Sequence, residues 1–197
     1  MIRFNIDMLR MYPGATIHCN CRKSVLGQLG KWVLKSWGTH DAMVLHVPGI
    51  GTVVGNVAPL FARYVSIAEF EKILEEVDAE VRVLIPTGYR QEDGMKASLS
   101  WIRDVQGRMY DFMAYPRLFI KGITKNIFVE KFHWKWAEKP AGWTWAFWCT
   151  EGNAQAWNSK PLFHDIWKSK NPTPLTTEHR EADGEFDDIT AACVEEQ

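Results

Sequence analysis

The alternation of hydrophobic and polar residues along the chain predicts a mixed α+β fold. Four short apolar runs, bounded by proline, glycine or polar residues, are typical of β-strands. They cover residues 15–19, 42–47, 52–57 and 81–85. Pro48-Gly49 separates the second run from the third, which indicates a β-hairpin.

Three further segments carry apolar residues at spacings of three and four, the period of a helix with one buried face. They cover residues 24–37, 66–77 and 92–105. Ser66 and Glu69 form a capping box that starts the second of these helices. In the third, we expect Met95, Leu99 and Ile102 to face inward.

The predicted hairpin fixes the relative positions of two polar residues. If its turn centres on Gly49, His40 lies opposite Ala58, and Asn56 is the diagonal neighbour of His40. Because side chains alternate along a strand, His40 and Asn56 then point to the same face of the sheet. A change of register by one residue would separate them.

The rest of the chain is less regular. Residues 121–142 have a poor pattern, with tryptophans and a proline, and we interpret them as a long functional or covering loop. Residues after 170 combine low apolar content with an acidic run and are expected to be disordered. We therefore predict one domain over residues 1–170 and an acidic tail over residues 171–197.

Charge is unevenly distributed along the chain. The tail holds eight acidic residues and one arginine, out of 24 acidic and 23 basic residues in the whole chain. The domain before it therefore keeps 16 acidic and 22 basic residues, an excess of six positive charges. Such a domain suits an anionic partner, such as cell-wall polymer, nucleic acid or acidic lipid. The excess is too small to choose among them, and nucleic acid is not the partner we expect.

The four cysteines show no evenly spaced framework, so we expect free thiols in a reducing compartment. His18, Cys19 and Cys21 invite a zinc interpretation, but a tetrahedral site needs about four ligands and no second pair is evident. We therefore expect no metal and no cofactor. The N-terminus lacks the layout of a signal peptide, and no apolar run is long enough to span a membrane, which predicts a cytoplasmic protein.

The strongest candidate for chemistry is Cys149. An aromatic run ends at this cysteine and a short amphipathic segment follows, so Cys149 is predicted in the first turn of a helix. Unpaired backbone N–H groups and the helix dipole favour the nucleophilic thiolate there. His40, which precedes an apolar strand, is the candidate base. A small buried cysteine without chemistry is the alternative interpretation of the same pattern.

The order of these signals resembles the permuted branch of the NlpC/P60 (papain-like) superfamily, the YiiX-like thiol hydrolases. The segment from Gly38 to Leu45 is similar to the histidine strand of that family. The segment from Phe147 to Glu151 is similar to its cysteine-bearing helix start, and the passage over residues 97–112 is similar to its helix, glycine and Tyr-Asp-Phe passage. The resemblance covers residues 13–167.

The resemblance implies a papain-like α+β fold, an antiparallel sheet with packed helices, and hydrolysis or transfer at an acyl group. Cys149 would attack an amide or ester carbonyl, His40 would take and return the proton, and Asn56 would hold the ring. The family often has a glutamate on the strand after the histidine strand. This chain has Gly55 at that position, and the neighbouring Asn56 is the residue we expect to replace the acid.

The resemblance further implies peptide bonds of bacterial cell-wall stems as substrates, and lipids for more distant members. We expect a cell-wall peptide amidase or endopeptidase. The missing export signal fits a bacterial cytoplasmic protein or a phage-encoded one, which would meet the wall after lysis or as part of a virion. Two alternatives stay open. Gly55 favours a catalytically inactive structural or binding protein, such as a virion component, that keeps the fold. The aromatic-rich sequence and the basic domain favour a lipid acyl hydrolase or acyltransferase.

Overall fold

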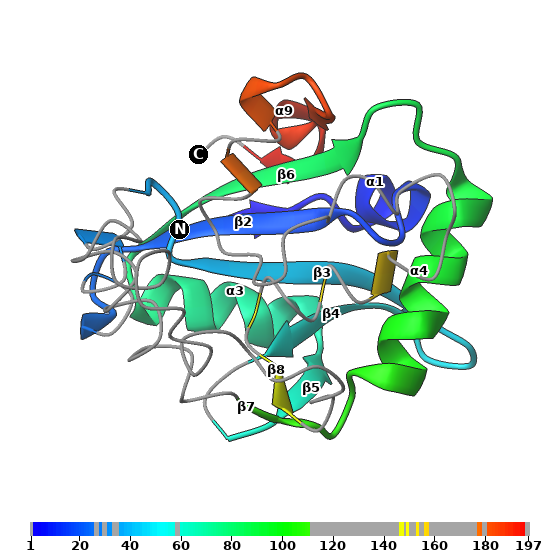
Figure 1. Cartoon of the computed structure of the whole chain (residues 1–197), viewed down its shortest axis with the longest axis horizontal. Coiled ribbons are helices and arrows are strands. Elements are labelled where there is room, and N and C mark those ends of the chain that lie inside the picture. The colour runs from blue at the N-terminus through cyan, green and yellow to red at the C-terminus, as the bar shows by residue number, and fades with distance from the viewer. Residues whose placement is uncertain are drawn as a thin grey trace, which may run out of the picture.

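The computed structural model describes residues 2–25, 28, 31–32, 36–57, 60–110, 146–147, 149, 153, 156–157, 177–178 and 181–195. Its centre is a six-stranded antiparallel sheet with the strand order β5-β4-β3-β2-β6-β9 (Figure 1). The strands are β2 (Thr16–Cys21), β3 (His40–Val47), β4 (Gly51–Val57), β5 (Ala62–Val65), β6 (Ala79–Pro86) and β9 (Phe186–Asp188). With the helices packed against it, this sheet confirms the predicted α+β class.

Helices and two small sheets complete the described part of the fold. The main helices are α1 (Ile6–Met11), α3 (Ile67–Glu76), α4 (Gln91–Asp104) and α9 (Thr190–Cys193). The small sheets join β1 (Arg3–Phe4) to β10 (Val194–Glu195) and β7 (Met109–Tyr110) to β8 (Ala146–Phe147). α4 packs against β3, and α3 packs against β4 and β6. Within the described ranges, no helix is both long enough and apolar enough to cross a membrane.

Alternation along β3 divides the core into two layers. Met43 and Leu45 belong to an apolar cluster that contains Trp101 of α4. Ala42 and Val44, their neighbours in the sequence, belong to a second cluster, which contains residues of α1, α3 and α9. We call the two sides of the sheet the α4 face and the α3 face.

The β3–β4 hairpin has the register that the sequence predicts. Val47 pairs with Gly51 and Ala42 pairs with Asn56, so the turn centres on Gly49. Gly49 has a φ of 80° and Gly51 a φ of 104°, backbone conformations that glycine adopts without a steric cost. The turn therefore fixes which residues of the two strands share a face.

The helix signals are confirmed for α3 and corrected for α4. Ser66 caps α3 and accepts a hydrogen bond from the Glu69 backbone N–H at 3.1 Å, as the capping box predicts. In α4, Leu99 is 46% exposed, whereas Ala97 and Trp101 are fully buried. Ile102 is half-buried and packs against the α4-face cluster, as predicted. The prediction is wrong for Leu99 because the buried face of α4 also contains small and polar residues, so large apolar side chains do not mark it.

The C-terminal residues differ from the predicted disordered tail wherever the structure describes them. β9 pairs with β6, β10 pairs with β1, and α9 lies between β9 and β10 in the chain. Phe186 is 5% exposed and Cys193 is fully buried, so apolar residues bury against the sheet although acidic residues surround them in the sequence. Glu181 also binds Arg82 of β6 with both carboxylate oxygens, each at 3.0 Å. The predicted loop over residues 121–142 lies outside the described residues.

Candidate thiol site

His40 and Asn56 form the contact that the hairpin register predicts. His40 Nε2 lies 2.8 Å from Asn56 Oδ1. His40 lies two residues before Ala42 in β3, and Asn56 lies two residues after Val54 in β4. Because Ala42 and Val54 belong to the α3-face cluster, the side chains of His40 and Asn56 point to the same face. With the amide oxygen accepting, the neutral ring carries its proton at Nε2 and keeps a lone pair at Nδ1. Burial lowers the pKa of His40, and Asp41 and Asn56 only partly oppose this, so the ring is neutral at pH 7.

Cys149 stands at a change from strand to helix. β8 ends at Phe147, and Cys149 is already helical, in agreement with the predicted helix start. The residue is 4% exposed and belongs to the apolar cluster of the α4 face, together with Met43 and Leu45. Figure 1 shows β8 beside β7, and the later described pieces, coloured yellow, between β8 and α4.

Two side chains beyond Cys149 fix its position along β3. Asn153 Nδ2 donates to the Ala42 carbonyl at 3.0 Å, and Trp157 Nε1 donates to the Gly14 carbonyl at 3.1 Å. Gly14 is bonded to Val44, so the step from residue 153 to residue 157 follows β3 away from His40. Asn153, and with it the segment that contains Cys149, is therefore bonded to the His40 end of β3.

The thiols of β2 support this position. Burial is the main cause of the raised pKa values of Cys19 and Cys21, and the charge of Cys149 raises both further. Cys19 is the register partner of His40 in the β2–β3 ladder. Cys149 therefore lies near the same end of β3 as His40, but on the other face of the sheet. The structure brings His40 and Asn56 together and places Cys149 across the sheet from them.

A second histidine, His18 of β2, lies on the α4 face with Cys149. It is the register partner of Asp41, and its Nδ1 lies 2.5 Å from Asp41 Oδ1. The other oxygen of Asp41 accepts a hydrogen bond from Thr177 at 3.1 Å. Burial alone would lower the pKa of His18, but Asp41 and Glu178 raise it to about 9. The ring is therefore an imidazolium at pH 7, enclosed by two carboxylates.

Glu178 approaches this imidazolium from the C-terminal part of the chain. Its Oε1 lies 3.6 Å from His18 Nε2, accepts from the Gly38 backbone N–H at 2.7 Å and accepts from the Ser36 hydroxyl. Burial would raise the pKa of Glu178, but its hydrogen bonds, including one from the Trp37 backbone, lower it to about 2. The carboxylate is therefore ionised throughout the physiological range.

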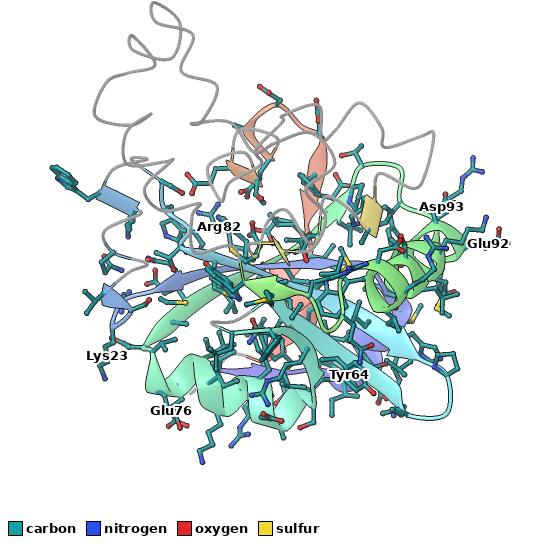
Figure 2. All side chains as sticks on the ribbon, turned by 60° about the horizontal axis from the view of Figure 1, so that its bottom comes forward. Lys23, Tyr64, Glu76, Arg82, Glu92 and Asp93 are labelled. Carbon is teal, nitrogen blue, oxygen red and sulfur yellow. The ribbon has the colours of Figure 1, made fainter. Side chains whose placement is uncertain are left out.

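The surroundings of His18 hold its ring in place. A Cβ added at Gly38 would overlap the ring, so this position requires glycine. The Trp37 ring packs against the His18 ring, with 5.3 Å between ring centroids, and Arg82 lies 4.6 Å from the Trp37 centroid. Figure 2 shows Arg82 on the side of the sheet opposite to Glu76 of α3. The α4 face thus carries a layered group of a guanidinium, an indole and an imidazolium.

The His18–Asp41 pair is the feature that the sequence interpretation missed. There, His18 entered only as a zinc ligand beside Cys19 and Cys21. Strand alternation puts those two thiols in the α3-face cluster, away from His18, and the described residues contain no group of three or more side chains placed to hold a metal. The pattern Thr16-x-His18 marks a polar side of β2, but only the β2–β3 register identifies Asp41 as the partner.

Comparison of the chain with protein-family models finds none that matches, and comparison with curated proteins finds no significant match.

Proposed function

We propose that the protein is a cysteine-dependent hydrolase of amide bonds with a papain-like architecture, and that Cys149 is its nucleophile. The observation that carries the proposal is the meeting of three features near one end of β3. The thiol stands at a strand-to-helix transition, and two histidines lie near this end. Each ring is held by a polar side chain, His40 by Asn56 and His18 by Asp41. A thiol with an oriented imidazole is the arrangement that thiol hydrolases use.

The chemistry follows from these groups. The sulfur of Cys149 attacks the carbonyl carbon, the C–N bond breaks, and a thioester and a free amine form. An imidazole transfers the thiol proton to the leaving nitrogen, and water then hydrolyses the thioester, which restores the thiol and releases a carboxylic acid. His40 is neutral and able to accept a proton, whereas His18 is already charged and able to stabilise the thiolate.

The sheet distinguishes the two histidines. His40 acts as the base only if the thiol reaches the α3 face, because Cys149 belongs to the cluster of the opposite face. His18 shares the α4 face with Cys149, and as an imidazolium it would act on the thiolate through its charge and not as a base. We therefore propose Cys149, His40 and Asn56 as the catalytic set, and His18 with Asp41 as the alternative partner of the thiol.

For the substrate we propose a peptide amide of the bacterial cell wall. The resemblance of the two motifs supports this choice. A phage-encoded protein that meets the wall at lysis or in the virion fits the same proposal.

A second candidate is a structural or binding protein that keeps the fold without catalysis. The observation that favours it is the burial of Cys149, which is 4% exposed among apolar side chains, together with the separation from His40. A cysteine in such surroundings is usually an inert part of the core.

Alkylation of the folded protein separates the two candidates. Iodoacetamide is added between pH 5 and pH 9, and the labelled cysteines are identified by peptide mapping. If the protein is a hydrolase, iodoacetamide labels Cys149 before the other cysteines. The unlabelled protein also releases new amines from cell-wall fragments. Cys149→Ser abolishes that release, and Cys193→Ser, in α9, serves as the matched control. Labelling of Cys149 only on unfolding, without amine release, would leave the non-catalytic candidate.

A further inference from the structure

The α4 face holds a group of hydrogen-bond donors arranged around one carboxylate. The Gly38 N–H donates to Glu178 Oε1 at 2.7 Å, and the Ser36 hydroxyl donates to the same oxygen. The His18 imidazolium lies 3.6 Å from it. Backbone N–H groups, a hydroxyl and a buried cation are the donors that proteins use to recognise carboxylates.

These donors are positioned by the sheet and not by Glu178. Asp41 holds His18 from the neighbouring strand at 2.5 Å, and Trp37 packs on its ring. The backbone that carries the N–H groups is anchored by the Thr39 N–H, which donates to the Cys19 carbonyl at 2.8 Å. The site is therefore built from residues 18 and 36–41, and Glu178 arrives from about 140 positions further along the chain.

Glu178 fits this site imperfectly. All three of these contacts involve Oε1, and the distance of 3.6 Å to His18 Nε2 exceeds hydrogen-bond length. His18 is fully buried, and its Nε2 has no hydrogen-bond partner within the described part of the chain. A buried imidazolium N–H that is 3.6 Å from its carboxylate is poorly satisfied, and a carboxylate oxygen placed closer would satisfy it. The Glu178 side chain is 19% exposed, whereas Ser36 and His18 beneath it are buried.

We propose that Ser36, Gly38 and His18 form a receptor for the carboxylate of a peptide, and that Glu178 fills this receptor in cis until a peptide displaces it. A bound peptide carboxylate would use both oxygens, one on the Gly38 N–H and Ser36 and the other on His18 Nε2. The receptor lies on the face that contains Cys149, which places the bound peptide on that face. The proposal does not depend on hydrolysis by Cys149.

The test compares two glutamine variants of the full-length chain. Glu178→Gln removes the internal carboxylate, and Glu181→Gln, which changes a carboxylate of the same segment bound to Arg82, is the matched control. Acetate is titrated while NMR follows the ¹⁵N-labelled His18 ring. A site filled in cis for nine-tenths of the time weakens outside binding by about tenfold. Glu178→Gln should therefore bind acetate at least about tenfold more tightly than the wild type and Glu181→Gln.

Three peptides then identify the source of the carboxylate. One has a free C-terminus, one is its amide, and one is an amide with a glutamate side chain. Saturable shifts of the His18 ring with either acid, and none with the neutral amide, support the receptor. Equal acetate affinity of Glu178→Gln and wild type overturns it. If Glu178→Gln does not fold, the titration uses the wild type, and the absence of a saturable His18 shift at high acetate overturns the proposal.

Discussion

The charge of His18 predicts an unusual dependence of stability on pH. The folded-state pKa is raised from 6.5 to about 9, mainly through Asp41 and Glu178 acting against burial. At about 1.4 kcal/mol per pKa unit, the charged ring contributes about 3 kcal/mol to the free energy of unfolding. Because the folded pKa lies above the unfolded one, this contribution is fully present below pH 6.5 and is lost as the pH rises through 9.

The other buried titratable groups determine the pH range in which the His18 contribution can be measured. Burial lowers the pKa of His40, so His40 destabilises the fold only below about pH 6.5. Burial raises the pKa of Cys19 and Cys21, so these thiols add a loss of stability only at higher pH. Between pH 6.5 and pH 8.5 the His18 contribution dominates, and it falls by about 2 kcal/mol.

Urea unfolding followed by tryptophan fluorescence measures this loss at several pH values. His18→Gln should be less stable than the wild type at pH 6.5, and its stability should be nearly constant up to pH 8.5. His46→Gln, at a histidine of β3 outside the network, should keep the wild-type slope. If the free energy of unfolding falls equally with pH in the wild type and in His18→Gln, the assignment of the charge to His18 is refuted. If the variant does not fold, NMR titration of the His18 ring in the wild type measures the pKa directly, and a value near 6.5 would refute the assignment.

Three substitutions test the packing and hydrogen bonds of the described core, each by urea unfolding at pH 7. Gly38→Ala pushes a methyl group into the His18 ring and should cost about 1–3 kcal/mol, and wild-type stability would show that the two do not touch. Asn56→Ala leaves the half-buried His40 Nε2–H without its acceptor and should cost about 1–3 kcal/mol, whereas no loss would argue against that bond. Ser66→Ala removes the cap of α3 and should cost about 1 kcal/mol, and an unchanged midpoint would contradict the capping role.

Features set by residues close together in the sequence are predictable here. The Pro48-Gly49 turn determines the β3–β4 register, and that register brings His40 and Asn56 to one face, where they bond. The Ser66 cap is equally local. Such features need no knowledge of distant parts of the chain.

Features set by distant pairing could not be predicted. His18 and Asp41 meet because β2 pairs with β3. More than twenty residues separate the two side chains in the sequence, so no short turn between the strands fixes their register. The ordered C-terminal strand and helix depend on Phe186 and Cys193, two apolar residues whose burial is hidden by the acidic composition around them. The face on which Cys149 lies depends in turn on the contacts of Asn153 and Trp157 with the sheet.

The placement of Cys149 leads to a last prediction, about which histidine controls its reactivity. A cation within about 10 Å in a partly buried site stabilises a thiolate by on the order of 1 kcal/mol, close to a tenfold change in its population. His18 is charged and shares the α4 face with the thiol, whereas His40 is neutral and lies on the α3 face. Alkylation of Cys149 at pH 7 should therefore slow by up to about tenfold in His18→Gln and change little in His40→Gln. Both variants are compared in a background with Cys19, Cys21 and Cys193 replaced by alanine. Slowing by His40→Gln alone would mean that the working thiol reaches the α3 face, as the proposed Cys149–His40 pair requires.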